Sequence, residues 1–482
     1  MALYAAYATA RAPIARHQVE SIALAFVVVG VATHVLIGPA TGLQTVLRRR
    51  SRWGWLPWCA GSLLLYSPIL GIGLLSDDFV LVELARRGEF GSVHAEFFRP
   101  IPLGAWAGIW HVVPTPIALH VVSVTAHGLV AFLVTRLAVP MLSSRLLAVA
   151  AGMIVLTFPA SVEAVAWISG VFDVSATLLA LLAVESGRRY VGAPGPSTRA
   201  AMMLAAVSSL LCKETGIVVP ALIALDAWAL RHWTRRLRID MAVLTAAFIA
   251  VGVVRVVLAS DIVHQPIVKY TIQRWLFGTI GGLTTPWHEQ VVASSPWLPL
   301  AGVATTIVLF TTFFVTRSDA RTKRLAVATS GWLLLGAAPT LTFFFVAGDL
   351  QGSRYLYLPV TGYALLIGIV AESAFRRSWV GAWLIAGLAA LGAAGVSSHQ
   401  RCWQEAALAR DAVISAAATD VRMRSCPAIS LSGLPDSVRG AYVFRNGARE
   451  AFADAGLTLI DRAPPSCTFA WDTTRAVFTI AP

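Results

Sequence analysis

The sequence predicts an all-α polytopic membrane protein with about twelve transmembrane helices, followed by a small C-terminal α/β domain on the extracytoplasmic side. The 482-residue chain is 57% hydrophobic and only 13% charged, and its mean hydropathy is +0.71. A soluble globular protein of this size would carry far more charge. Apolar runs of about 20 residues, the length that crosses a bilayer, recur along the chain. Arginine collects in every second connection between these runs.

The apolar runs place the helices in chain order. The expected spans lie near residues 20–42, 54–75, 116–138, 145–160, 164–184, 199–212, 214–231, 240–258, 297–316, 323–346, 355–373 and 378–397. The first run lacks a clean small-residue cleavage site, so we expect it to be retained. It forms either an extra helix outside the core or an interfacial segment. Three regions follow from this reading: an N-terminal segment 1–53, a membrane core 54–397 and an extracytoplasmic domain 398–482.

Basic residues indicate the orientation, because short loops rich in Lys and Arg stay in the cytoplasm. Six short segments in alternate loops hold 19 of the 38 basic residues. They contain Arg48, Arg49, Arg50 and Arg52; Arg136 and Arg145; Arg188, Arg189 and Arg199; Arg231, Arg235, Arg236 and Arg238; Arg317, Arg321, Lys323 and Arg324; and Arg376 and Arg377. The net charge of +13 is thus mainly a topology signal and gives no reason to expect nucleic acid. The composition suits a protein integral to a bacterial inner (plasma) membrane.

Two long loops, 76–115 and 259–296, face outward in this topology. The aromatic and small apolar stretch from His94 to His111 predicts an amphipathic helix on the outer surface. In the second loop, Ile272 to Leu283 is too short to span and predicts a re-entrant or interfacial helix that lids the site.

The tail after residue 397 has short alternating runs that predict strands of a small α/β domain. These runs are Ala428 to Leu434, Ala441 to Phe444 and Ala476 to Ile480. Asn446-Gly447 predicts a turn between two of them. Cys426 and Cys467 lie in this outward tail, and we expect them to form a disulfide in an oxidising compartment.

Two adjacent acids, Asp77 and Asp78, are the strongest local signal of a functional site. They stand where the apolar run Trp55 to Leu75 ends, and ionised acids at the edge of a bilayer are costly unless a site uses them. One interpretation is an N-cap on the following helix by Asp77 or Ser76. The other is a catalytic pair that acts as a general base or holds a hard divalent cation, Mg²⁺ or Mn²⁺, with other oxygens.

Further acids and bases fall at the outer ends of predicted spans. They are Arg99, Glu163, Lys213, Glu214 and Arg354. Lys213-Glu214 is either a solvated loop pair or a site pair at two helix ends. Arg354, with Tyr355 and Tyr357, is either an interfacial anchor or a phosphate ligand, since guanidinium binds phosphate oxygens bidentately. His120 and His127 are seven residues apart and share a helix face; each is either a helix-packing residue, the commoner case, or a ligand. Asp173 lies deeper, and we expect it to pair internally.

The chain resembles the GT-C glycosyltransferases, polytopic enzymes that take a sugar from a polyprenyl-phosphate carrier. In particular, it resembles the protein O-mannosyltransferases that carry tetratricopeptide repeats, over about residues 54 to 375. Five segments carry the resemblance in order: Asp77-Asp78 with Phe98-Arg99-Pro100; His120 and His127; Phe158-Pro159 with Glu163-Ala164-Val165 and Asp173; Cys212-Lys213-Glu214 with Pro220; and Arg354-Tyr355-Leu356-Tyr357-Leu358-Pro359. Two departures leave sugar and acceptor open: no tetratricopeptide array follows the membrane region, and Phe172 replaces the basic residue expected before Asp173.

The resemblance implies a mechanism and partners. Asp77 or Asp78 would be the general base for an acceptor hydroxyl on a glycan, lipid or protein, with inversion at the sugar carbon. Lys213, Arg354 and Arg99 would neutralise the phosphate of the polyprenyl-phosphate-linked sugar donor, where charge develops. The residues expected to position substrate are Glu163, Glu214, Tyr355, Tyr357 and His94.

Two other functions are alternatives to glycosyl transfer. A lipid-carrier or solute transporter or flippase would tend to show internal repeats and polar sites near mid-membrane. A transferase of another group from a lipid carrier, such as an O-antigen ligase or phosphoethanolamine transferase, is a second alternative. A sugar-nucleotide donor is not expected, because no glycine-rich phosphate loop follows a strand.

Overall fold

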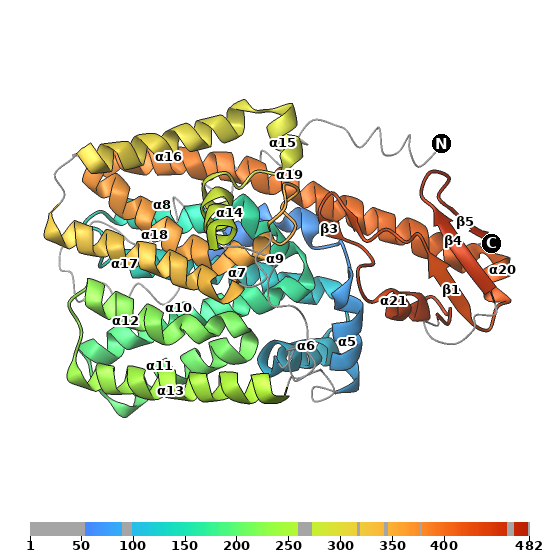
Figure 1. Ribbon diagram of the computed structural model, residues 1–482, viewed down its shortest axis with the longest axis horizontal. Coiled ribbons are helices and arrows are strands. Elements are labelled where there is room, and N and C mark those ends of the chain that lie inside the picture. Colours follow the sequence, from blue (N-terminus) through green and yellow to red (C-terminus); the bar gives the residue numbers. More distant parts are fainter. Residues whose placement is uncertain are drawn as a thin grey trace.

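The computed structural model describes residues 54–88, 99–258, 272–315, 319–341, 346–375, 378–459 and 467–480. Helices dominate, and long apolar helices lie side by side in a bundle that carries a small strand-containing domain at one end (Figure 1). The predicted N-terminal segment 1–53 and its span lie outside the described residues. A helical bundle with a small C-terminal strand region agrees with the predicted fold class.

The predicted apolar runs correspond closely to the helices of the bundle. These helices are α4 (Leu56–Leu65), α7 (Pro116–Ala138), α8 (Arg145–Leu156), α10 (Val171–Gly192), α11 (Pro196–Cys212), α12 (Val219–Ala229), α13 (Arg235–Leu258), α16 (Trp297–Val315), α17 (Ala320–Ala337), α18 (Tyr357–Ala374) and α19 (Ser378–Thr419). The run 116–138 coincides with α7. Its buried side includes Val124, Val130 and Val134, so this helix packs in the middle of the bundle.

Two predicted spans are interrupted near a proline. The run 54–75 gives the ten-residue helix α4 and then the short 3₁₀ helix η2 (Ser67–Ile69), which contains Pro68. In the run 145–160, helix α8 ends at Leu156. The next helical stretch, Pro159–Ala166, is bent by 49° from α8. Phe158, which precedes Pro159, is extended (φ −76°, ψ 119°). A residue before proline avoids the helical region, so the chain breaks there.

The number of membrane spans differs from the prediction. Within the described ranges, four helices are long and apolar enough to cross a membrane, or five if the bent pair forms one span. Several helices suitable for an integral membrane protein are therefore present, but twelve spans are not shown. Part of the difference lies in short elements such as α4 and α12, with 10 and 11 residues.

Shorter helical elements connect the bundle helices. They are α5 (Asp77–Arg87), α6 (Pro100–Val112), η4 (Pro159–Ser161), α9 (Val162–Ala166), η5 (Ile168–Gly170), η6 (Glu214–Val218), α14 (Ile272–Thr284), α15 (Glu289–Ser294), η7 (Ala338–Thr340) and η8 (Ser353–Leu356). The expected amphipathic helix corresponds, in its described part, to α6. The expected Ile272–Leu283 helix is α14, and its Gly282 passes so close to Leu356 that a Cβ would lie 2.5 Å from Leu356 Cδ1. Thus α14 packs against the element that carries Arg354.

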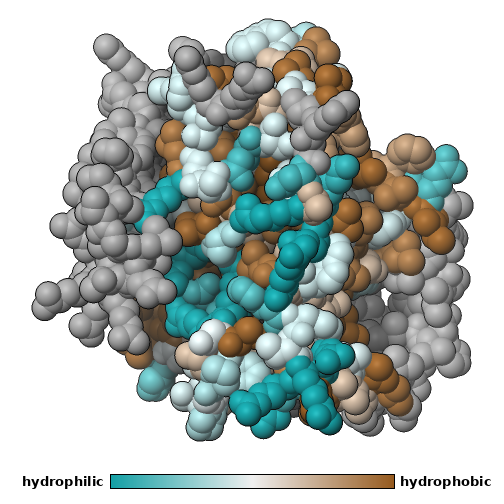
Figure 2. Space-filling model, turned by 90° about the vertical axis from the view of Figure 1, so that its left-hand side faces the viewer, coloured by the Kyte–Doolittle hydropathy of each residue, from teal (hydrophilic) through white to brown (hydrophobic). Residues whose placement is uncertain are grey.

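Arginine-rich connections meet at the end of the bundle opposite the C-terminal domain. Arg136 Nη2 lies 2.6 Å from Glu185 Oε1, which joins the ends of α7 and α10. Arg188 Nη2 lies 2.6 Å from Asp226 Oδ1, which joins α10 to α12. Figure 2 looks onto this end, where hydrophilic side chains gather in the middle. The described connections near Arg136 and Arg188, which were predicted to face the cytoplasm, thus lie at one end of the bundle.

Helix α19 joins the bundle to the C-terminal domain. It runs unbroken for 42 residues across residue 397, where the membrane core was expected to end (Figure 1). Its second half packs on the irregular segment after α4: Arg410 Nη1 donates to the carbonyls of Ile72 (2.7 Å) and Leu74 (2.6 Å). At Gly73 (φ +73°) a Cβ would lie 2.8 Å from the Arg410 guanidinium. This contact fixes the segment that leads into Asp77.

The C-terminal domain is a small α/β unit, as predicted. Its elements are α20 (Val421–Arg424), β1 (Ile429–Ser432), β2 (Ser437–Val438), β3 (Ala441–Tyr442), α21 (Ala448–Asp454), β4 (Cys467–Asp472) and β5 (Val477–Ile480). Strand β4 lies between β1, to which it is parallel, and β5, to which it is antiparallel. β2 and β3 form a separate hairpin, whose turn residues Arg439 and Gly440 both have positive φ, as tight hairpin turns require.

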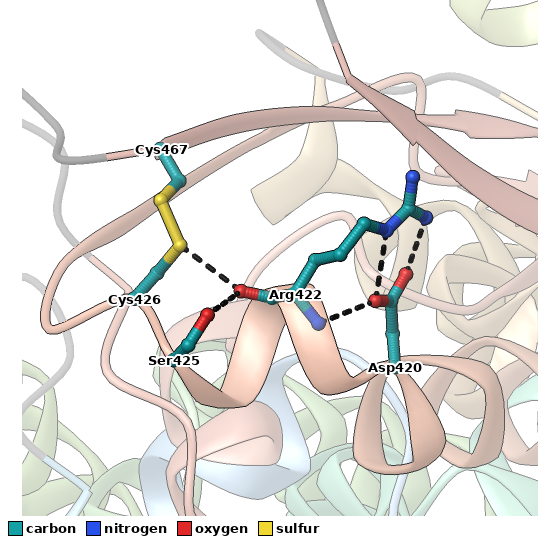
Figure 3. Close-up of a disulfide and its surroundings, with 5 residues drawn as sticks. All are labelled: Asp420, Arg422, Ser425, Cys426 and Cys467. Carbon is teal, nitrogen blue, oxygen red and sulfur yellow. Dashed lines mark hydrogen bonds and ion pairs between the residues drawn. A yellow bond between two sulfur atoms is a disulfide. The ribbon is translucent and has the colours of Figure 1, made fainter.

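The predicted disulfide between Cys426 and Cys467 is present (Figure 3). It fastens the end of α20 to the first residue of β4, across a sequence separation of 41 residues. Beside it, Asp420 is the N-cap residue of α20. Its carboxylate accepts hydrogen bonds from the backbone N–H and the guanidinium of Arg422. The covalent bond and the cap together hold the start of the small sheet.

Replacing Cys426 or Cys467 by Ser is expected to destabilise the C-terminal domain. A disulfide of this loop length restricts the unfolded chain and contributes about 2–4 kcal/mol. Limited proteolysis in detergent would measure this as faster cleavage of residues 420–480 in either variant. The wild-type protein treated with a reductant is the matched control and should behave like the variants. Equal cleavage rates in oxidised wild-type and variant proteins would contradict the expectation.

Candidate functional site

The two adjacent acids have different surroundings. Asp78 is 1% exposed, and its carboxylate accepts three hydrogen bonds: Oδ2 from Leu75 N (3.0 Å), and Oδ1 from Ser169 N (2.8 Å) and Ser169 Oγ (2.5 Å). It therefore ties the start of α5 to η5, just before α10. Burial raises the pKa of Asp78 to about 7, although the hydrogen bonds from Ser169 and Leu75 act in the opposite direction.

Asp77 is half-buried and faces the C-terminal domain. Its Oδ1 accepts a hydrogen bond from Asn446 Nδ2 at 2.5 Å and one from Ser76 Oγ at 3.4 Å. In the part of the chain that the structure describes, no group donates to Asp77 Oδ2. Asp77 is therefore the member of the pair that has an oxygen available to a substrate.

Ser76 holds Asp77 in place through an unusual backbone conformation. It occupies the N-cap position of α5 but makes no side-chain capping bond, so capping by Ser76 does not explain the motif. Its φ of 51° is rare for a residue other than glycine and is typical of functional sites. Two hydrogen bonds with the C-terminal segment support this conformation. Ser76 N donates to Val443 O (2.9 Å), and Asn446 N donates to Ser76 Oγ (3.3 Å).

Glu163 and Arg354 form a buried ion pair. Glu163, on α9, is 1% exposed and also accepts hydrogen bonds from Ser353 Oγ (3.3 Å) and Arg354 N (3.3 Å). Tyr442, from β3, donates its hydroxyl to Glu163 Oε1 (3.2 Å) and accepts from Arg354 Nη1 (3.0 Å). The Arg354 guanidinium also lies 4.8 Å from the Trp167 ring centroid. Three parts of the chain that are far apart in sequence therefore meet at this pair.

Lys213 pairs with Asp173, as expected for an acid that lies deep in the protein. Its Nζ lies 2.6 Å from both Asp173 carboxylate oxygens, and both side chains are buried. Burial lowers the pKa of Lys213; Asp173 opposes this shift, whereas the positive charges of Arg99 and Arg354 add to it. Arg99 and Arg354 therefore both lie within electrostatic reach of Lys213.

Arg99 and Glu214 form the third pair. Arg99 Nη2 lies 3.0 Å from Glu214 Oε2, and the Glu214 side chain is 41% exposed. Burial would raise the pKa of Glu214, but the charges of Arg99 and Lys213 hold it below its usual value. The Arg99 guanidinium lies over the Phe172 ring, 5.0 Å from its centroid. Arg99 thus places a positive charge beside the position where the resemblance led us to expect a basic residue.

Tyr355 lies between two of these pairs. Lys213 Nζ is 5.4 Å from its ring centroid, and Arg354 Nη2 donates to its hydroxyl at 3.3 Å. We call the three ion pairs together the ion-pair cluster. It consists of Arg99, Glu163, Asp173, Lys213, Glu214 and Arg354. Asp77 is linked to the cluster through the C-terminal domain: Asn446, which binds Asp77, follows closely in sequence after Tyr442, which binds Glu163 and Arg354.

Some predicted residues do not join this arrangement. Tyr357 is buried among the helices, where its hydroxyl lies 2.6 Å from His127 Nδ1. His120 Nε2 lies 3.2 Å from the carbonyl of Gly73. Both histidines therefore serve helix packing, as one interpretation predicted. His94 lies outside the described residues.

The residues that the sequence did not single out come mainly from the C-terminal domain. Tyr442 and Asn446 were assigned only to a strand and a turn, and Ser169 to a span. Each owes its position to tertiary contacts rather than to a local pattern. Only the Asn446-Gly447 turn gave a signal, because a turn places a polar side chain at a defined corner.

The geometry does not favour a cation shared by Asp77 and Asp78. Both oxygens of Asp78 are occupied by hydrogen bonds to Leu75 and Ser169, and Asp77 faces Asn446. The two carboxylates therefore do not converge on one point. Within the described residues, no group of three or more His, Cys, Asp or Glu side chains has the arrangement of a metal site.

Comparisons with known proteins give a partial relationship. The chain is 33% identical over 144 residues to the protein O-mannosyl-transferase Tmtc1 of Drosophila melanogaster. The match covers 30% of this chain and 16% of that protein. No protein-family model and no solved structure matches the chain. The similarity indicates a mannosyltransferase-like relationship over part of the chain.

The raised pKa of Asp78 predicts how pH changes the stability of the protein. The folded state binds this proton more tightly than the unfolded chain, in which a carboxyl titrates near about pH 4. Protonated Asp78 therefore favours the folded state at about pH 4, and this contribution to the free energy of unfolding is lost as the pH rises towards about 7. Melting temperatures of the wild type and Asp78→Asn, measured in detergent between about pH 5 and pH 8, would test this. We expect the wild type to lose stability relative to the variant as the pH rises, and a pH-independent difference would contradict it.

Proposed function

We propose that the chain is an integral-membrane glycosyltransferase that moves a sugar from a polyprenyl-phosphate carrier to an acceptor hydroxyl on the extracytoplasmic face. The observation that carries this proposal is the proximity of Arg99 and Arg354 to Lys213, together with the connection from Arg354 through the Tyr442–Asn446 segment to the half-buried Asp77. The partial similarity to a protein O-mannosyl-transferase supports the same class of reaction. A glycan, a lipid or a protein would supply the hydroxyl.

Asp77 is the proposed general base. Its Oδ2 takes the proton of the acceptor hydroxyl while that oxygen attacks the anomeric carbon of the sugar. The bond from the anomeric carbon to the phosphate oxygen breaks on the opposite side, so the configuration inverts and polyprenyl phosphate leaves. A positioned base of this kind contributes about 10²- to 10⁴-fold to the rate. Asp78 is not a second base in this scheme, because hydrogen bonds occupy its carboxylate.

The three cations are proposed to bind the donor phosphate. Negative charge grows on the leaving phosphate as the bond breaks, and fixed positive groups stabilise that charge. Each cation already has an acidic partner, so the cluster is held in position before the donor arrives. Glu214 is the partner with the most exposed side chain of the three acids, and its turning away from Arg99 would release that guanidinium for phosphate. The buried Glu163 holds Arg354 in position, and Tyr355, which lies beside Lys213 and Arg354, is proposed to contact the sugar hydroxyls.

A small apolar crevice is the proposed place where the polyprenyl tail begins. Its cavity volume is about 50 Å³, and it lies among α8, α14, α16, α18 and α19. Its lining includes Phe158, Pro159, Trp287 and Leu388. Phe158 and Pro159 lead directly into η4 and α9, which carries Glu163. An isoprenoid in this crevice would therefore end near the cations.

Asp77→Asn is expected to reduce sugar transfer by about 100-fold or more, because the amide cannot accept the proton. The measurement is transfer of radiolabelled mannose from undecaprenyl phosphate mannose in membranes that contain the protein. The melting temperature should be unchanged, whereas Asp78→Asn should lower it. Undiminished transfer by Asp77→Asn would refute the role of this acid. Movement of the donor across vesicles without any transfer by the wild type would instead favour a lipid-carrier transporter.

Leu388→Trp is expected to fill the crevice and impair use of a long-chain donor. The rate with undecaprenyl phosphate mannose should fall about tenfold, which corresponds to about 1.4 kcal/mol. The rate with a two-isoprene (citronellyl) phosphate mannose should change much less, because its tail is short. Leu408→Trp, on an exposed residue of the same helix, is the control. Equal losses with both donors would show that the crevice does not hold the tail.

A further inference from the structure

Asn446 is unusual in this chain in its residue type as well as in its position. It is the only asparagine among the 482 residues. It lies in the C-terminal domain, 369 residues after Asp77 in sequence, and its side-chain amide donates to Asp77 Oδ1 at 2.5 Å. Asn446 N also donates to Ser76 Oγ at 3.3 Å. One residue thus contacts both the proposed base and the residue that precedes it.

The segment that carries Asn446 is anchored on both sides. Before it, Tyr442 bonds to Glu163 and Arg354 of the ion-pair cluster. After it, Gly447 (φ +76°) lies so close to Ser76 that a Cβ would be 2.4 Å from the Ser76 carbonyl oxygen. Because glycine alone fits there, the backbone on either side of Asn446 has little freedom. This backbone places the exposed side-chain amide of Asn446 within hydrogen-bond distance of Asp77.

We propose that Asn446 is a positioning residue of the transfer reaction, which orients the Asp77 carboxylate so that Oδ2 faces the acceptor hydroxyl. This inference rests on the proposed function of Asp77 as the general base. Asn446 Nδ2 occupies Oδ1 and leaves Oδ2 as the oxygen that can take a proton. Asparagine suits this task, because its amide donates a hydrogen bond to a carboxylate and adds no charge. The C-terminal domain thereby completes a site whose base lies in the membrane core.

A simpler role for Asn446 would be to form the turn before α21. Asn-Gly pairs are common in turns, and aspartate favours turns almost as strongly as asparagine. The two roles differ in what they require of the side chain. A turn residue can be replaced by Asp, whereas a donor to Asp77 cannot, because an ionised Asp is only an acceptor and would repel Asp77.

The test compares Asn446→Ala and Asn446→Asp in full-length protein in membranes, with undecaprenyl phosphate mannose as the donor. If Asn446 positions Asp77, Asn446→Ala lowers the maximal rate roughly 10- to 100-fold, as expected for a lost hydrogen bond to a charged group. Asn446→Asp is at least as slow. The apparent KM for the donor stays within about twofold, because Asn446 does not contact the cations. Gln351→Ala, which removes a contact to Arg445 of the same segment, should retain the wild-type rate.

The outcomes separate this inference from the proposed function. Wild-type rates for Asn446→Asp with slow transfer by Asn446→Ala would support the turn role and overturn the inference. Wild-type rates for both variants, with Asp77→Asn inactive, would also overturn it while leaving the function intact. Full activity of Asp77→Asn would instead refute the function. Melting temperatures of each variant distinguish slow chemistry from unfolding, and Asn446→Asp retains both side-chain size and turn preference if Asn446→Ala does not fold.

Discussion

The buried carboxylate of Glu163 is the constraint on which the rest of the site depends. An ionised acid that is 1% exposed is costly unless charge and hydrogen bonds compensate it. Here the compensation comes from η8, through Ser353 and Arg354, and from β3, through Tyr442. Elements separated by up to 279 residues must therefore be assembled before Glu163 is satisfied. The docking of the C-terminal domain on the bundle is part of the electrostatics of the core.

The other acids of the cluster also need a compensating cation, and this need keeps the positive groups of the cluster in place. Asp173 needs Lys213, and Glu214 lies against Arg99, so each cation is fixed by a nearby acid. Removing one partner of such a buried pair costs more than the pair contributes, because a bare charge remains. In the proposed reaction, the cluster would therefore supply positive groups in fixed places, so that little reorganisation remains when charge develops on the donor phosphate.

The sequence predicted what depends on local pattern and failed where tertiary contacts decide. Hydrophobic runs located α7 closely, and two cysteines in the C-terminal tail led to the correct disulfide. The run 54–75 was read as one span because hydropathy does not register the break near Pro68. Likewise, adjacent acids gave no sign that Asp78 would face Ser169 and Asp77 would face Asn446. Only the fold determines which side of the turn each carboxylate occupies.

The conformation of Ser76 links the C-terminal domain to the proposed base. A non-glycine residue at φ 51° costs about 1–3 kcal/mol and persists only where its surroundings hold it. Two hydrogen bonds from the C-terminal segment, each contributing about 0.5–1.5 kcal/mol, are of the size needed to offset that strain. Without them, Ser76 would relax to an ordinary backbone conformation and α5 would start differently. Asp77, the first residue of α5, would then lose its position against Asn446, so the proposed active arrangement and the docked domain form together.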